Sequence, residues 1–247
     1  MELPKIKVPA LYKSPRKLLI YSPPKCGKTT AGSMLDNALI VDLEEGSDFI
    51  DALKVKVSTV AELKDLTDSL KQAGYPYKYG IIDTTTKLEE LVLPLAAQMY
   101  RETPMGKNWG KQRDGTNDPS ANILTLPNGG GYLYLRQAYT KVSTTLDNCF
   151  ERVIYFGHLK DKMLEKNGKE VSARDIDLTG KIRNIACANA DAIGYMYREG
   201  NKTIISFKTA QDVICGARPE HLRDKEITLL EYNDGKFTHH WDKIYID

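Results

Sequence analysis

The chain has 247 residues, of which 41% are hydrophobic and 28% charged, and its formal net charge is +2. These values predict a soluble globular protein, and the small net charge gives no global reason to expect a nucleic-acid partner. The sequence excludes a membrane-spanning helix of about 18 apolar residues and lacks the apolar core of a signal peptide. Its four separated cysteines, with no C-x-x-C pair, predict reduced thiols, so we expect a cytoplasmic protein.

Residues 1–17 mix prolines and basic residues with a few apolar ones, among them Ile6, Val8 and Leu11. We expect a loosely ordered N-terminal arm. The alternative is an extended arm that pairs with the sheet edge of a neighbouring subunit. No later stretch has the composition of a linker, so we expect residues 18–247 to form a single domain.

A phosphate-binding loop follows the first predicted strand, residues 18–21. The stretch Ser22-Pro23-Pro24-Lys25-Cys26-Gly27-Lys28-Thr29-Thr30 matches G-x-x-x-x-G-K-[ST], except that Ser22 replaces the first glycine. A strand before the loop and a helix after it favour a nucleotide site over an ordinary turn. Lys28 would reach the β- and γ-phosphates of ATP, and the Thr29 hydroxyl would hold Mg²⁺. The predicted phosphate cradle consists of Lys25, Cys26, Gly27, Lys28, Thr29 and Thr30.

Two further apolar runs end in acidic residues. Residues 38–41 lead into Asp42-Leu43-Glu44-Glu45, and residues 79–82 lead into Asp83, with an amphipathic helix over 60–73 between them. Such runs are typical of buried parallel strands, whose carboxyl ends meet at the ligand-binding edge of an open α/β sheet. Asp83 is therefore the predicted Mg²⁺ residue.

The second half of the chain alternates long irregular segments with regular elements. A glycine-rich segment over 101–131 precedes a helix over 132–151 and a strand over 153–156 that ends near His158. A second segment, 161–179, is predicted to be flexible, with a hairpin tip at Asn167-Gly168. A helix over 180–188 and antiparallel hairpins within 192–247 complete the chain.

Taken in order, these motifs resemble the RecA-like P-loop ATPases. The closest resemblance is to the short phage-encoded branch linked to single-strand annealing and recombination, a nucleotide-binding protein with an AAA-type ATPase domain. The likeness covers about residues 18–210. It implies an α/β fold with a RecA-like P-loop core, in which a mainly parallel sheet is flanked by helices and followed by C-terminal antiparallel hairpins.

The same resemblance implies roles for individual residues. Glu44 would be the catalytic glutamate that aligns the attacking water, and Asp83 would bind Mg²⁺. His158 would sense the γ-phosphate and signal to the DNA loops, although RecA carries a glutamine there. Positive charge that completes the site from a neighbouring subunit would come from Lys208, where the family carries such lysines, or from Arg218, which the rigid turn 216–219 would present. The alternative for either residue is an exposed charge at a strand end.

By the same resemblance, the two irregular segments, 101–131 and 161–179, would occupy the places of the family's DNA-binding loops. Their predicted DNA contacts are Lys107, Trp109, Lys111, Arg113, Lys160, Lys162, Lys166, Lys169 and Arg174, and Tyr132 or Tyr134 could also stack on bases. The alternative is a solvated surface, because seven basic residues over 160–183 face five acidic ones, an excess of two.

The favoured function is an ATPase that uses ATP and Mg²⁺, binds single-stranded DNA and promotes annealing or homologous recombination. It would assemble as a homo-oligomer, either a ring or a filament, with no membrane partner. A single-strand-binding protein is a further candidate partner, and a phage-encoded chain would act in the bacterial host cytoplasm. The alternatives are a P-loop NTPase or kinase with a non-DNA substrate, or a module that binds ATP and scarcely hydrolyses it.

Overall fold

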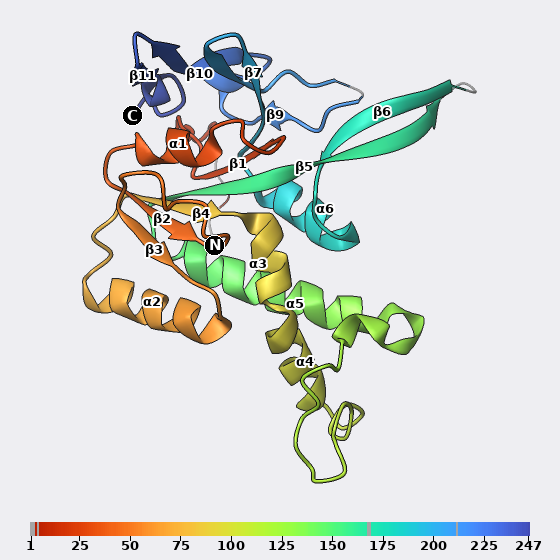
Figure 1. Ribbon diagram of the computed structural model, residues 1–247. Helices are drawn as coiled ribbons and strands as arrows, with labels where there is room; N and C mark the ends of the chain where they lie inside the picture. The colour runs from red at the N-terminus through yellow and green to blue at the C-terminus, as the bar shows by residue number, and fades with distance from the viewer. Residues whose placement is uncertain (1–2, 4, 167–168, 211) are drawn as a thin grey trace.

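The computed structural model describes residues 3, 5–166, 169–210 and 212–247, and it describes only the backbone of residues 162–166 and 169–172. A mainly parallel sheet with strand order β7-β1-β5-β4-β2-β3 forms the centre (Figure 1). The strands are β1 (Lys17–Ser22), β2 (Ala38–Asp42), β3 (Lys54–Lys56), β4 (Tyr79–Asp83), β5 (Arg152–Lys166) and β7 (Ala192–Glu199). The P-loop strand β1 therefore lies between β5 and β7, with neighbours on both sides.

Helices cover both faces of this sheet. Along β1, Leu19 and Tyr21 belong to one buried cluster and Leu18 and Ile20 to another, because successive side chains point to opposite faces. The helix α1 and the C-terminal segment cover one face, and the longer helices cover the other (Figure 1). The helices are α1 (Lys28–Ser33), α2 (Val60–Gln72), α3 (Thr85–Leu91), α4 (Leu93–Arg101), α5 (Gly130–Asp147) and α6 (Gly180–Asn189).

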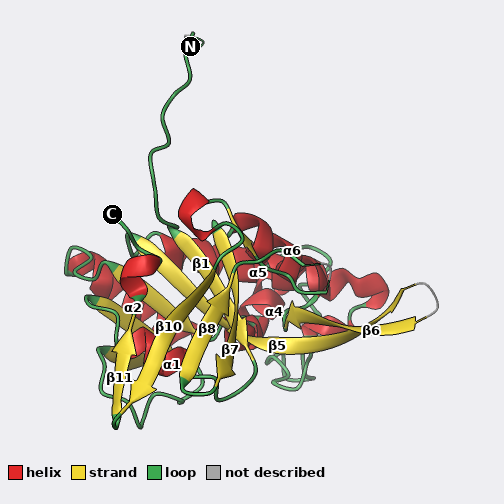
Figure 2. Cartoon of the chain, turned by 90° about the horizontal axis from the view of Figure 1, so that it is seen from above, coloured by secondary structure: helices red, strands yellow, loops and turns green. Residues whose placement is uncertain are grey.

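Antiparallel strands extend the sheet beyond β7. The order continues β8-β10-β11 (Figure 2), so that both predicted C-terminal hairpins are present. Strand β9 pairs with β7. Near the end of the chain, the buried Trp241 ring donates a hydrogen bond of 2.8 Å to the carbonyl of Ala31 in α1. The strands are β8 (Lys202–Ser206), β9 (Gly216–Ala217), β10 (Glu226–Asn233) and β11 (Lys236–His239). The predicted fold class is confirmed.

The second irregular segment differs from its prediction. Residues 159–166 pair with 169–176 as strands β5 and β6 (Lys169–Ile176), so a two-stranded ribbon replaces the expected flexible stretch. Most of the ribbon lies beyond the parallel sheet (Figures 1 and 2). Backbone hydrogen bonds define it rather than an apolar side-chain pattern, which is why the sequence indicated a hairpin tip but not the length of the paired strands. The predicted tip, Asn167-Gly168, lies outside the described residues.

Smaller differences occur elsewhere. The short strand β3 was not predicted, and the segment after α4 contains two short 3₁₀ helices, Ile123–Thr125 and Pro127–Gly129. Two more, Glu220–Leu222 and Trp241–Lys243, lie near the C-terminus. Ahead of β1, apolar residues of the N-terminal segment are exposed, and the segment leads away from the sheet (Figure 2). Among the described residues, no helix has the length and apolar character that crossing a membrane requires.

Candidate nucleotide site

The P-loop turns from β1 into α1 around two residues with left-handed backbone conformations, Lys25 (φ 62°) and Gly27 (φ 94°). Glycine adopts this conformation without a steric penalty, which suits Gly27 to its place before the helix. Inside α1, a Cβ on Gly32 would approach Ile81 to 3.0 Å and Phe156 to 3.2 Å. The absence of a side chain at Gly32 therefore lets α1 lie close to the sheet beneath the loop.

Ser22, the departure from the P-loop pattern, contacts the P-loop lysine. Ser22 is the last residue of β1 and does not have a positive φ, so the serine is not strained there. The Lys28 ammonium is buried and donates a hydrogen bond of 2.8 Å to Ser22 Oγ. Burial lowers the pKa of Lys28, while the nearby Asp83 opposes that shift. An ammonium has three N–H donors, so Lys28 keeps donors for phosphate oxygens while it contacts Ser22.

Thr29 and Asp83 meet at the carboxyl edge of the sheet. The Thr29 hydroxyl donates a hydrogen bond of 2.6 Å to Asp83 Oδ2, across 54 residues of sequence. Burial raises the pKa of Asp83, and the bond from Thr29 acts in the opposite direction. Hydroxyl and carboxylate oxygens fit Mg²⁺, which keeps several waters and binds few protein groups. The described residues contain no cluster of three or more His, Cys, Asp or Glu side chains, so water and phosphate oxygens would supply the other ligands.

Glu44 meets Thr84 and His158 at the same edge. Its Oε1 accepts a hydrogen bond of 2.5 Å from the Thr84 hydroxyl and lies 2.8 Å from His158 Nε2. A carboxylate can only accept, so Nε2 is the donor to an ionised Glu44. The other ring nitrogen of His158, Nδ1, is buried and has no hydrogen-bond partner among the described residues. The structure thus brings together two residues that stand 114 positions apart, as well as Thr84, which the sequence did not single out.

Asp42 holds the loop that carries Glu44. Its carboxylate accepts hydrogen bonds from the backbone N–H groups of Glu44 (3.0 Å), Gly46 (3.3 Å) and Ser47 (3.0 Å), and from the Ser47 hydroxyl. Burial alone would raise the pKa of Asp42, but the bonds from Ser47 and the backbone outweigh it and lower that pKa. Asp42, the last residue of β2, therefore positions the loop, and Glu44 in that loop faces the site.

Lys208 and Arg218 lie away from this group of residues. The guanidinium of Arg218 contacts Asp191 Oδ1 at 3.1 Å and the Ala188 carbonyl at 2.6 Å. Asp191 immediately precedes β7, whose first residue lies beside Leu18 at the amino end of β1, the end opposite the P-loop. Lys208 forms an ion pair with Glu226. Within one chain, neither cation is brought to the nucleotide site.

The predicted DNA contacts fall into four groups. Trp109 is partly buried, with Tyr100 against its ring at 5.5 Å and the guanidinium of Arg101 over it at 5.2 Å, so it anchors its segment. On the ribbon, Lys160 pairs with Asp177 at 2.9 Å, and Arg174 lies 5.1 Å from the centroid of the Tyr195 ring. Lys107, Lys111 and Arg113 are exposed, and the side chains of Lys162, Lys166 and Lys169 lie outside the described residues.

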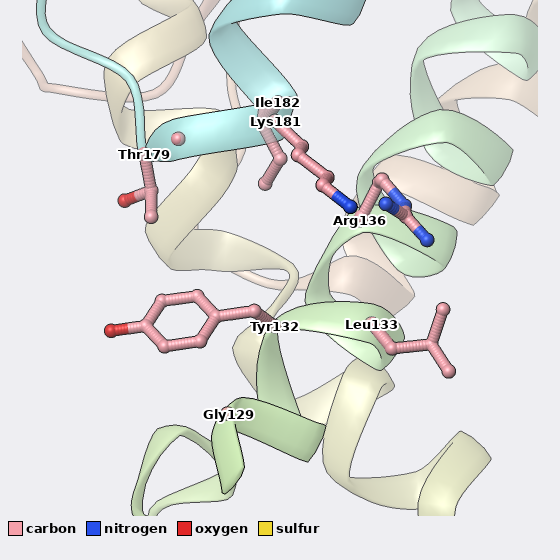
Figure 3. A pocket seen from close by; sticks show the side chains of 8 residues that line it. Gly129, Tyr132, Leu133, Arg136, Thr179, Lys181 and Ile182 are labelled. Atoms are coloured by element: carbon pink, nitrogen blue, oxygen red, sulfur yellow. The ribbon is translucent and has the colours of Figure 1, made fainter.

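A cavity of about 440 Å³ lies where the two segments return to the core. The start of α5 and the start of α6 line it, and Lys181 extends toward Arg136 (Figure 3). Neither cation forms an ion pair with a described carboxylate. Tyr132 lies at the rim with 48% of its surface exposed. The sequence did not single out these cations, because each lies inside a predicted helix rather than in a loop.

Comparisons with known proteins identify the family. Two solved structures are similar over 91% of this chain: the RadB recombinase (10% identity, TM-score 0.46, 91% of that chain) and a KaiC-like protein from Pyrococcus horikoshii OT3 (12% identity, TM-score 0.44, 89% of that chain). No curated protein matches the sequence. A family model described as an AAA domain matches residues 14–219, which include the P-loop, Glu44, Asp83 and His158. The chain belongs to this AAA domain family and is a P-loop ATPase.

Proposed function

We propose that this chain is an Mg²⁺-dependent ATPase that binds single-stranded DNA and couples ATP turnover to annealing or recombination of the phage type. One observation carries the proposal: strand β5 runs without a break from the nucleotide site into the ribbon. His158, which contacts Glu44, lies on the same strand as Lys160 and residues 161–166.

We assign a separate role in ATP hydrolysis to each of the residues at the carboxyl edge of the sheet. Lys28 and the loop N–H groups would bind the phosphates, and Thr29 and Asp83 would hold Mg²⁺. Bound there, the metal would neutralise charge on the phosphate oxygens. Thr84 and His158 both contact Oε1 of Glu44, which leaves its other oxygen to accept a proton from the attacking water.

His158 lies on β5, and it is also hydrogen-bonded to the residue that follows β6. Its carbonyl accepts a hydrogen bond of 2.9 Å from the backbone N–H of Asp177, just after β6 ends. Two residues later, Thr179 donates its N–H to Glu89 at 2.9 Å and begins the wall of the cavity in Figure 3. A displacement of His158 on nucleotide binding would therefore reach the ribbon and the cavity through a few backbone contacts.

The cavity suits a segment of single-stranded DNA. Arg136 and Lys181 would contact a backbone phosphate, and the exposed ring of Tyr132 would stack on a base. The small net charge of the chain does not argue against DNA binding here, because Arg136 and Lys181, two cations without a described carboxylate partner, line the same cavity.

ATP hydrolysis measured with and without single-stranded DNA tests the proposal. We expect stimulation by DNA in the native chain and its loss in the Arg136→Ala/Lys181→Ala double variant. Lys64→Ala/Lys71→Ala, which removes two exposed cations from α2, is the control and should retain stimulation. A rate of ATP hydrolysis that DNA does not change would favour a kinase or an NTPase with another substrate. Binding without hydrolysis would favour an ATP-bound module.

We further propose that the chain assembles as a homo-oligomer whose ATP sites are shared. Arg218 lies at the end of the sheet opposite Lys28, so it could serve only the site of another subunit. Mixing Lys28→Ala chains with Arg218→Ala chains, and separately with Lys208→Ala chains, should restore part of the activity if the cation acts across an interface. No recovery at any ratio, from variants shown to co-assemble, would place the catalytic charge within one chain.

A further inference from the structure

The antiparallel strands form a wall beside the P-loop. Strand β7 stays paired with β1 as far as Tyr195 and then continues to Glu199, past the end of β1 at Ser22. Strand β10 runs in the same direction as β7, because β8 between them is antiparallel to both. The tip of the β10–β11 hairpin therefore lies beyond the carboxyl edge of the sheet, on the side where the P-loop lies.

Contacts with Gly27 show which face of these antiparallel strands is directed toward the P-loop. A Cβ built on Gly27 would lie 3.9 Å from both Leu230 Cδ1 and Thr203 Oγ1. Leu230 also belongs to the buried cluster that contains Cys26 and Ala31. Its side chain therefore projects from β10 toward the loop and α1.

Two aromatic residues occupy the next position on this face. Tyr232 follows Leu230 by two residues and so projects from the same face of β10, about 7 Å farther along the strand. Phe237 of β11 lies directly opposite Tyr232, and the two ring centroids are 4.7 Å apart. Tyr232 and Phe237 remain 44% and 40% exposed, so each ring retains free surface beside the P-loop. The neighbouring Glu231 is on the other face and pairs with Lys202 at 3.1 Å.

We propose that Tyr232 and Phe237 form the stacking surface for the base of the bound nucleoside triphosphate. This inference rests on the proposed function only in that the P-loop holds the triphosphate. A nucleotide with its phosphates in the loop extends its base away from the loop, and the aromatic pair lies about 7 Å along the strand from Leu230, which is next to Gly27 of the loop. Aromatic rings stack on any base, so the surface contributes affinity for the nucleoside half of the ligand without reading its hydrogen-bonding edge.

Comparison of two ligands separates the base from the phosphates. Binding of a non-hydrolysable ATP analogue and of inorganic tripolyphosphate, each with Mg²⁺, would be measured by titration calorimetry. In Tyr232→Ala and in Phe237→Ala we expect the analogue to bind roughly 5- to 100-fold more weakly, with tripolyphosphate unchanged. Tyr232→Phe keeps the ring and should bind the analogue as the native chain does. Tyr75→Ala removes an equally exposed ring (44%) after the end of α2 and is the control.

Each result bears on one hypothesis. Unchanged binding of the analogue in both alanine variants would overturn the stacking surface and leave the P-loop proposal intact. Equal weakening of both ligands would also overturn it, because the pair would then act only by supporting the hairpin. If neither ligand binds the native chain, or if Lys28→Ala weakens neither, the nucleotide site itself would be refuted.

Discussion

Replacing Glu44 with glutamine should separate ATP binding from ATP hydrolysis. In the structure, Thr84 and His158 both contact Oε1, and a glutamine carbonyl oxygen can accept the same two hydrogen bonds. The amide that replaces Oε2 cannot take a proton from water. We therefore expect the substitution to preserve the local contacts and remove only the basic oxygen.

The expected size of the effect follows from what a general base contributes. Its loss should lower kcat by about 10²- to 10⁴-fold, which corresponds to roughly 3 to 5 kcal/mol in the activation free energy. The affinity for ATP should stay within about threefold, because the phosphate contacts of Lys28 are untouched. Single-turnover hydrolysis of radiolabelled ATP measures the first quantity, and titration calorimetry measures the second.

Glu45→Gln provides the matched control. Glu45 is the adjacent acid and has a left-handed backbone (φ 59°), and it forms none of the hydrogen bonds that Glu44 forms with Thr84 and His158. The control should keep nearly full activity. A reduction below about tenfold in Glu44→Gln would refute the assignment of the base, and a large reduction in Glu45→Gln alone would transfer the role to Glu45.

Three further predictions concern the DNA interface and the stability of the fold. Neutralising Lys162, Lys166 and Lys169 should weaken single-strand binding and lower the slope of log affinity against log salt by about 0.7 for each DNA phosphate that these lysines neutralise; an unchanged slope would mean that they only solvate the ribbon. Trp241→Phe should lower the free energy of unfolding by about 0.5–1.5 kcal/mol, because the Ala31 carbonyl loses its 2.8 Å hydrogen bond but still accepts one of 3.3 Å from the Met34 N–H, and chemical denaturation would show it. A hydrogen bond with Ser14, followed by contacts with Arg152, lowers the pKa of Asp247 to about 2 in the folded chain. Because the folded pKa is depressed, the stabilisation is present above about pH 4 and is lost as the pH falls toward 2. Thermal unfolding of Asp247→Asn should lack that part of the pH dependence.

Local patterns in the sequence determined the parallel core and the P-loop. Runs such as residues 38–41 and 79–82 are apolar throughout because both faces of the sheet are covered, and that pattern is visible without a structure. The motif around Lys28 needs only adjacent residues, so its spacing can also be read directly. The place of Asp42 and Asp83 at the carboxyl edge of the sheet could also be predicted, because each follows directly after one of these apolar runs.

Contacts between distant residues were decided only by the tertiary structure. The approach of His158 to Glu44, the hydrogen bond from Thr84, and the cavity between α5 and α6 depend on how the strands order themselves in the sheet. A turn signal at Asn167-Gly168 suggested a hairpin, but the length of the paired strands β5 and β6 was hidden, because backbone hydrogen bonds carry no residue-specific signature. A sequence records the chemistry that each position offers. Which of these groups meet depends on the packing of the whole chain, because each contact between distant residues forms only when the many other native contacts stabilise the same fold.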